Sequence, residues 1–330
     1  MDNSIKKIML SDISKENINI DLFVCFSSFE ERCLSISKYI NRERIKESII
    51  FYNEDNIDYV GNNLKRLESF YGEKARRVPV MHCNPLRTAD MMINTFKKKS
   101  ISDSVGCVFL DTTSFTHEAL LIVLKIIPLF FPKATLICGY ANADDYDSNN
   151  TSNEKWLSKG ISEIRSVLGY PGDFLPAQKT HLILIAGYEY ERAYSIINCV
   201  EPSSISLGFG QSNNATAQKN MDANEHYAHL VEQMATNYCM NKIEKFEVKC
   251  NDPFVTCEKV TEQILKYKDK NIMIVPLNNK ISTIGVALAT SKYDGVQLCY
   301  APALAYNYEH YSLPGNHCYL FKIPNNVEEN

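Results

Sequence analysis

The sequence resembles itself at an offset of 160 residues. Residues 21–36 (DLFVCFSSFEERCLSI) align without a gap with residues 181–196 (HLILIAGYEYERAYSI). Toward the end of each half, residues 140–146 (YANADDY) align with residues 300–306 (YAPALAY) at the same offset. Two residues drawn from an average composition agree about one time in sixteen. Identities that cluster at corresponding places therefore indicate an internal duplication, and we expect two similar lobes.

Each half alternates short apolar runs with helical periodicity, which is typical of a parallel sheet with crossover helices. The predicted strands are residues 22–26, 48–52, 77–81, 106–110 and 135–138, then 181–185, 205–209, 246–248, 271–275 and 295–299. The predicted helices include residues 119–127, ended by Pro128, and residues 154–168, 224–238 and 252–267. The sequence thus predicts an α/β fold of two tandem Rossmann-like lobes, at 1–170 and 171–330, each a mainly parallel five-stranded sheet with flanking helices, related by internal duplication.

The composition limits the partners that we expect the protein to bind and the cellular compartment in which we expect it. The 330 residues carry a formal net charge of −4, which favours no long nucleic acid. No apolar run approaches the ~18 residues of a membrane span and no signal peptide is recognisable, so we expect a cytoplasmic protein with no membrane partner. The 11 cysteines are odd in number and lack CxxC spacing, which predicts free buried thiols instead of disulfides. We expect no metal and no cofactor.

Candidate ligand-binding residues follow from the position of the strands. In an open parallel sheet, ligands bind beyond the carboxyl ends of the strands. The residues predicted there are Ser27, Ser28, Arg32, Thr113, Ser114, Gly187, Tyr188, Arg192, Asn279, Lys280 and Tyr300. Arg32 and Arg192 could each hold a phosphate through the guanidinium fork. They could equally pair with a nearby carboxylate and lock a helix to the sheet, and the sequence leaves both interpretations open.

Two further patterns concern chemistry at the same edge. The C-terminal run contains aromatic and imidazole side chains that could stack a base or simply pack: Tyr300, Tyr306, Tyr308, His310, Tyr311 and His317. The sequence has no GxSxG, HExxH or Walker motif. If the chain is an enzyme, its acid–base groups are predicted to be Glu31, Asp111, His117 and Glu191. Ordinary capping and surface roles explain these residues as well, so the sequence does not decide whether the chain is an enzyme.

The two-lobed plan, with a polar loop after the fourth strand, resembles the CARF sensor domains and their two-lobed SAVED relatives. The loops concerned are Asp111-Thr-Thr-Ser114 and Asn278-Asn-Lys280, which match the family's Asp-x-Thr-x-Gly-Thr-Lys-like loop only in part. These families recognise cyclic oligonucleotides or related nucleotide signals in prokaryotic antiviral systems. The resemblance implies a ligand pocket lined by Thr113, Ser114, Asn279 and Lys280 together with Ser27, Ser28, Gly187 and Tyr188.

The preferred hypothesis is therefore a nucleotide or cyclic-oligonucleotide signal-binding protein of a prokaryotic defence or stress pathway. Because two lobes occupy nearly the whole chain, we expect it to act through a separate effector protein. One alternative is an enzyme that cleaves a phosphodiester or N-glycosidic bond of a nucleotide or nucleoside. Another is a non-catalytic scaffold subunit. The sequence leaves the oligomeric state open, a homo-oligomer included.

Overall fold

The chain divides into two compact units. Unit 1 comprises Met1–Asn149 and Tyr308–Asn330, and unit 2 comprises Asn150–Asn307. The residues that the computed structural model describes are 4–102, 104–146, 157–211, 229–233, 243–309 and 311–324. The C-terminal segment thus belongs to unit 1, whereas the sequence-based division at residue 170 assigned it to the second lobe.

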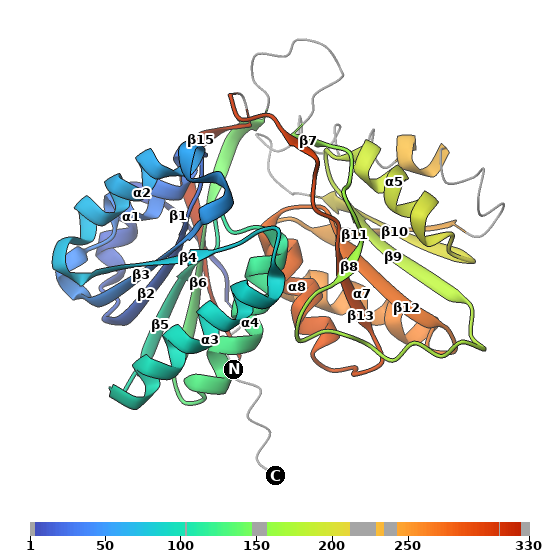
Figure 1. Cartoon of the computed structure of the whole chain (residues 1–330), viewed down its shortest axis with the longest axis horizontal. Helices are drawn as coiled ribbons and strands as arrows, with labels where there is room; N and C mark the ends of the chain where they lie inside the picture. The colour runs from blue at the N-terminus through green and yellow to red at the C-terminus, as the bar shows by residue number, and fades with distance from the viewer. Residues whose placement is uncertain are drawn as a thin grey trace. The chain divides into compact units, whose positions relative to one another are not determined.

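Unit 1 is built on a mainly parallel sheet. Its strands are β1 (Lys6–Met9), β2 (Ile20–Ser27), β3 (Ile45–Asn53), β4 (Ala75–Val80), β5 (Cys107–Asp111), β6 (Thr135–Tyr146) and β15 (Ser312–Ile323). Their order across the sheet is β1-β15-β6-β5-β2-β3-β4 (Figure 1). The strands from β6 to β4 are parallel neighbours. β15 joins the free edge of β6 in the antiparallel sense, and β1 pairs with β15.

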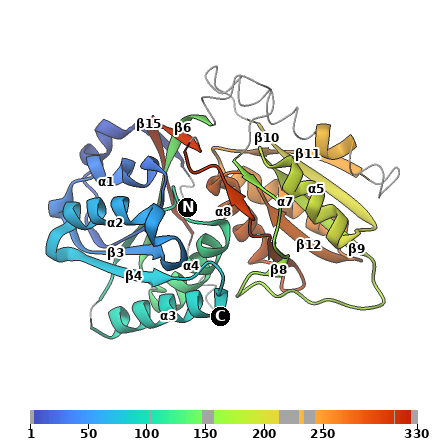
Figure 2. The ribbon, with the colours of Figure 1, turned by 45° about the horizontal axis from the view of Figure 1, so that its top comes forward.

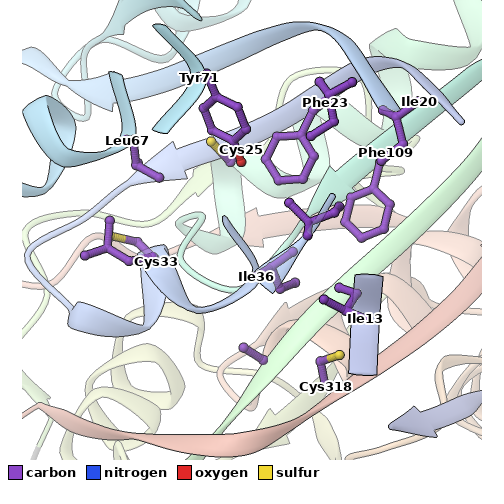
Figure 3. Packing of buried hydrophobic residues seen from close by; sticks show 14 of the residues in the cluster. Ile13, Ile20, Phe23, Cys25, Cys33, Ile36, Leu67, Tyr71, Phe109 and Cys318 are labelled. Carbon is purple, nitrogen blue, oxygen red and sulfur yellow. The ribbon is translucent and has the colours of Figure 1, made fainter. Parts of the chain in front are cut away.

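Helices cover both faces of this sheet. They are α1 (Ser35–Tyr39), α2 (Ile57–Tyr71), α3 (Pro85–Ser102) and α4 (His117–Phe130), with short 3-10 turns η1 (Leu10–Glu16), η2 (Glu31–Leu34), η3 (Arg42–Arg44), η4 (Glu54–Asn56) and η5 (Gly72–Lys74). The side chains of α1 and α2 pack on the face that presents Phe23 and Cys25 (Figure 3). Phe26 points to the other face, where its ring meets Phe115 just before α4. This alternation follows from the period of two along a strand.

Unit 2 repeats the arrangement. Its strands are β7 (Ser158–Lys159), β8 (Arg165–Ser166), β9 (Thr180–Ala186), β10 (Ser204–Gln211), β11 (Ile243–Lys249), β12 (Asn271–Pro276), β13 (Gln297–Tyr300) and β14 (Ala305–Tyr306). The larger sheet has the order β11-β10-β9-β12-β13-β8, in which only β8 is antiparallel to its neighbour among the described strands (Figure 2). β14 and β7 form a separate pair. The helices that accompany these strands include α5 (Tyr190–Val200), α7 (Pro253–Lys266) and α8 (Lys280–Thr290), and the described residues 229–233 are helical as well.

The two sheets share one strand order. When the parallel strands of each unit are numbered along the chain, both sheets run 3-2-1-4-5, and each adds an antiparallel strand beside the fifth. This is the order of a Rossmann-like half-sheet. The predicted α/β class with mainly parallel sheets is confirmed, and each of the ten predicted strands overlaps an observed one.

Three expectations about the elements need correction. The sheets have seven and six strands instead of five, because β15, β1 and β8 extend the edge beyond the fifth parallel strand. The helix predicted at 154–168 is wrong in its described part, where β7 and β8 lie. Helix α4 continues past Pro128 to Phe130, since a proline in the last turn removes only one backbone bond. Most of the helix predicted at 224–238 lies outside the described residues.

No helix in the described part of the chain is long and apolar enough to cross a membrane.

Candidate functional site

The carboxyl edge of each sheet holds the residues of interest. In a 3-2-1-4-5 sheet the crevice lies between strands one and four, because the chain leaves these strands in opposite directions. In unit 1 these strands are β2 and β5, and in unit 2 they are β9 and β12. The predicted ligand residues of each unit follow those strands, apart from Tyr300, which ends the fifth strand β13.

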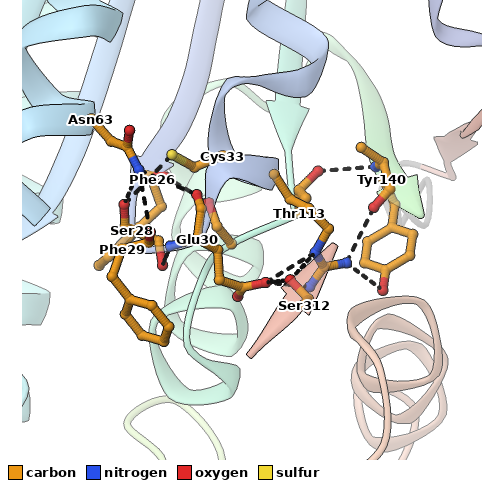
Figure 4. A network of polar contacts seen from close by, with 12 residues as sticks. Phe26, Ser28, Phe29, Glu30, Cys33, Asn63, Thr113, Tyr140 and Ser312 are labelled. Carbon is orange, nitrogen blue, oxygen red and sulfur yellow. Dashed lines mark hydrogen bonds and ion pairs between the residues drawn. The ribbon is translucent and has the colours of Figure 1, made fainter. Parts of the chain in front are cut away.

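Arg32 of unit 1 is buried in a polar network at this edge (Figure 4). Its guanidinium forms an ion pair with Glu30, with Nη2 2.7 Å from Oε2, and Nε donates to Ser312 Oγ at 3.0 Å. Nη1 lies 3.4 Å from both the hydroxyl of Tyr140 and the carbonyl oxygen of Ala141. Arg32 thereby ties η2 to the middle of β6 and the start of β15. These partners fit the interpretation in which the arginine pairs with a nearby carboxylate and locks a helix to the sheet.

Arg192 of unit 2 occupies an equivalent network. It is buried, forms an ion pair with Glu189 and donates to Ser158 Oγ at 3.0 Å. Its Nη2 donates to the carbonyl oxygen of Ala301, which lies 160 residues after Ala141. Each arginine thus binds a backbone carbonyl two or three residues beyond the last pair that joins the fifth strand to the fourth in its own sheet. The Nε of Arg192 has no hydrogen-bond partner within the described structure.

The expected alternative that each arginine pairs with a nearby carboxylate is confirmed, although the sequence did not identify which carboxylate. Glu30 and Glu189 stand two and three residues before their arginines, and their spacing of 159 was the available signal. Ser158 and Ser312 are distant in sequence from the arginines that they contact, so no local pattern identifies them.

Asp111, at the end of β5, has a buried carboxyl group of which only one oxygen accepts hydrogen bonds within the described residues. Its Oδ1 accepts hydrogen bonds from the backbone N–H of Thr113, at 3.1 Å, and from the Thr113 hydroxyl. That hydroxyl in turn accepts from the N–H of Ala141 at 3.0 Å. Oδ2 has no hydrogen-bond partner within the described residues. Burial raises the pKa of Asp111 to about 7, although the Thr113 hydrogen bonds and the charge of Arg32 oppose the shift.

The corresponding position of unit 2 is apolar. Phe23 pairs with Phe109 in unit 1, and Leu182 pairs with Met273 in unit 2. In each unit, the side chains of this pair lie on the face of the sheet that is covered by the helix following the first strand. Two residues further along the fourth strand come Asp111 and the buried Val275. The fold therefore needs no carboxyl group at this position.

The remaining candidates in unit 1 mostly stabilise the loops themselves. Ser27 Oγ donates to the carbonyl of Val60 at 3.2 Å, and Ser114 Oγ donates to that of Phe26 at 2.6 Å. Ser28 Oγ accepts from the N–H of Glu30 at 3.3 Å. These bonds hold the loops after β2 and β5 in fixed positions.

In unit 2 the loops after β9 and β12 lie against each other. A Cβ on Gly187 would stand 2.6 Å from the carbonyl oxygen of Leu277, so only glycine allows this approach. Asn278 donates to the carbonyl of Ala186 at 2.6 Å. Asn279 caps α8 by accepting from the N–H of Ser282 at 2.9 Å, and the half-buried Lys280 is the first residue of that helix. Tyr188, which follows Gly187, is half-buried, and Tyr300 is buried.

The four acid–base candidates do not share one environment. Glu31 is exposed and pairs with Arg66, while Glu191 belongs to unit 2, on α5. Asp111 points to the face covered by α1 and α2, whereas the buried His117 begins α4 on the other face. The structure thus distinguishes Asp111 from the rest. A search of the described residues finds no group of three or more His, Cys, Asp or Glu side chains that could hold a metal ion.

His181 is a second buried titratable group, at the opposite edge of unit 2. Its ring stacks on Tyr267, with centroids 3.6 Å apart, and its nitrogens lie 2.7 Å and 2.9 Å from the hydroxyls of Ser204 and Ser206. Burial, followed by the charge of Lys270, lowers the pKa of His181 to about 3.

This shift predicts acid sensitivity. The unfolded chain takes up a proton on His181 below about pH 6.5, and the folded chain does not, so stability is present above that pH and is lost as the pH falls toward 3. Between pH 6.5 and 5.5 we expect a loss of about 1 kcal/mol. Urea unfolding of the wild type and of His181→Asn at both pH values measures it. Equal slopes with pH in the two proteins would contradict the assignment to His181.

Comparisons with known proteins give no family. No family model and no curated protein matches the sequence. Among solved structures, the chain is similar to the cytoplasmic domain of a prokaryotic cation chloride cotransporter (9% identity, 87% of this chain and 96% of that one, TM-score 0.26). It is similar to UDP-GlcNAc 2-epimerase from Neisseria meningitidis bound to UDP-GlcNAc (9% identity, 78% of this chain and 77% of that one, TM-score 0.25). It is also similar to spermidine synthase in complex with the transition state analogue AdoDATO (13%, TM-score 0.24), of which it spans 41%. The resemblance to CARF and SAVED domains stays a prediction.

Proposed function

We propose that this protein binds a nucleotide-type small molecule at the carboxyl edges of two lobes that arose by internal duplication. The defence or stress pathway and the separate effector rest on the resemblance to sensor domains alone.

Three features support duplication. Both sheets have the same strand order, and both place an arginine on the carbonyl of corresponding alanines, Ala141 and Ala301. In addition, the helices after the first strands present Cys33 and Ala193 to matching faces of the sheets. The match requires Phe23 to correspond to Leu182, at an offset of 159, so the ungapped alignment of residues 21–36 with residues 181–196 is wrong in the first strands. One inserted residue between Glu189 and Arg192 restores the offset of 160.

The observation that carries the ligand proposal is the loop pair of unit 2. The backbone of Gly187 lies directly against Leu277, and the next loop residues lead into the start of α8 with Lys280 in its first turn. The positive end of the α8 dipole favours an anion even though Asn279 caps the N–H of Ser282, and the ammonium group of Lys280 adds a positive charge. Phosphate or another anionic part of a nucleotide fits this chemistry.

A thermal-shift panel tests the proposal. ATP, AMP, cyclic dinucleotides and cyclic oligoadenylates are added in turn, and a nucleotide at one hundred times its Kd should raise the stability of the native protein by about 2.7 kcal/mol. Mass spectrometry of the same mixtures distinguishes binding from cleavage. Failure of every nucleotide to shift the melting temperature would contradict the proposal and favour the scaffold alternative.

Lys280→Met is the matching substitution. Loss of a charge-assisted bond of about 1.5–3 kcal/mol should weaken binding of the stabilising nucleotide about tenfold or more. Lys268→Met is the control, because Lys268 is exposed and precedes β12 at the opposite edge of the same sheet. Equal weakening by both substitutions would argue against a site at α8.

An enzyme that cleaves a nucleotide or nucleoside is the second candidate, and Asp111 favours it. A carboxyl group with a pKa of about 7 can donate or accept a proton at neutral pH. Products in the mass spectra that disappear with Asp111→Asn would support catalysis.

A further inference from the structure

Four aromatic side chains form a cluster in unit 1, which we call the aromatic platform: Phe29, Tyr59, Tyr308 and Tyr311. The ring of Tyr59 stacks on that of Tyr308, with centroids 4.1 Å apart and planes inclined by 9°. The edge of Phe29 meets the rings of Tyr308 and Tyr311 at 4.8 Å and 5.3 Å. Tyr59 is nevertheless 55% exposed, although one face of its ring stacks on Tyr308.

The platform lies at the carboxyl edge of the sheet. Phe29 follows β2, and Tyr59 stands in the first turn of α2, which follows β3. Tyr311 directly precedes β15, whose first residue Ser312 pairs with Tyr146 at the carboxyl end of β6. Three separate segments of unit 1 thus bring their rings to the edge where α/β sheets bind ligands.

The loop that carries Phe29 is held by hydrogen bonds to α2. The amide of buried Asn63 donates to the carbonyl of Ser28 at 2.9 Å and lies 3.4 Å from the carbonyls of Phe29 and Glu30 (Figure 4). The Phe29 ring projects away from this polar network. Because the loop is held before any ligand arrives, little conformational entropy is lost when a ring stacks on the platform.

We infer that the aromatic platform stacks the base of the nucleotide, with the exposed Tyr59 as its contact residue. An exposed aromatic side chain held by stacking on a neighbour suits a planar heteroaromatic ring, and such contacts contribute about 1–3 kcal/mol each. This inference rests on the proposed function and concerns a nucleotide bound at the carboxyl edge of unit 1 by itself.

AMP and ribose 5-phosphate are the probes, because they differ only in the base. We expect wild-type protein to bind AMP about tenfold more tightly than ribose 5-phosphate in calorimetric titrations. Tyr59→Ala should lower the affinity for AMP about tenfold and leave that for ribose 5-phosphate unchanged, whereas Tyr59→Phe should bind AMP like the wild type. Tyr39→Ala is the control, since Tyr39 is 46% exposed and ends α1 away from the platform.

A measurement on the unmodified protein complements the variants. In saturation-transfer NMR, the adenine H2 and H8 protons of AMP should receive more saturation than the ribose protons. Unchanged AMP affinity in Tyr59→Ala, or equal saturation of the base and ribose protons, would contradict the inference that the platform stacks the base. Neither result would contradict the proposed function. If wild-type protein binds neither AMP nor any other nucleotide of the panel, the proposed function falls and the inference falls with it.

Discussion

Arg32→Met is expected to lower the free energy of unfolding by about 3–5 kcal/mol, because it removes one partner of a buried ion pair. Both Arg32 and Glu30 are buried, with side-chain exposures of 4% and 9%. The substitution would leave the carboxylate of Glu30 without its cation and remove a donor from the carbonyl of Ala141. Arg192→Met should lower the free energy of unfolding by a similar amount, since the buried carboxylate of Glu189 would lose its cation. Chemical denaturation monitored by circular dichroism measures both.

Two further variants test whether the lost stability comes from the buried charge of Glu30. Arg66→Met breaks an exposed pair with Glu31 and should cost no more than about 1 kcal/mol. The double variant Glu30→Gln/Arg32→Met should recover part of the lost stability, since no charge remains buried. If Arg32→Met unfolds like the wild type but loses nucleotide binding, Arg32 is a ligand residue and the locking role is wrong.

Asp111→Asn is expected to stabilise the protein at pH 8 by up to about 4 kcal/mol. The pKa of Asp111 is about 7 in the folded chain against 3.8 for an ordinary aspartate. A raised pKa in the folded state favours the protonated form, so its contribution is complete below pH 3.8 and is lost as the pH rises through 7. Asparagine keeps an acceptor for the N–H of Thr113 and carries no charge at any pH.

The measurement is a pair of stability curves between pH 4 and pH 8. The wild type should lose stability relative to Asp111→Asn as the pH rises. Asp58→Asn, at an exposed site on α2, should follow the wild type throughout. Parallel curves for the wild type and Asp111→Asn would show that the carboxyl group is ionised in the folded protein without penalty. A stabilised variant with lost activity or binding would mean that Asp111 is retained for function.

Most of the parallel strands were predictable because they contain a short apolar run bounded by polar segments. β15 was not, since Ser312–Ile323 contains Pro314 and Gly315, shows no regular alternation of buried and exposed residues, and acquires its place only by pairing with β6. The same holds for β7 and β8, which are two residues long and depend on β14 and β13. Their sequences have no period of their own, which is why a helix was expected there.

At the site, the sequence predicted Arg32 and Arg192 in the first helical turns after the first strands and Asp111 after the fourth, and the structure has them in η2, in α5 and at the last residue of β5. It did not decide what the arginines bind, because the choice depends on carbonyls and hydroxyls more than one hundred residues away. The unpaired oxygen of Asp111 depends on burial by several elements, which no local pattern reveals. The aromatic platform likewise joins Tyr59 to Tyr308 across most of the chain.

Hydrogen–deuterium exchange with and without AMP tests the central claim most directly. If a nucleotide-type ligand binds at the carboxyl edges, AMP should slow exchange in peptides that contain the loops after the strands, at residues 28–31, 56–60, 112–117, 187–190 or 277–281. Protection confined to the opposite edges, for example residues 104–107 and 175–180, or no protection with AMP or any other nucleotide of the panel, would contradict it.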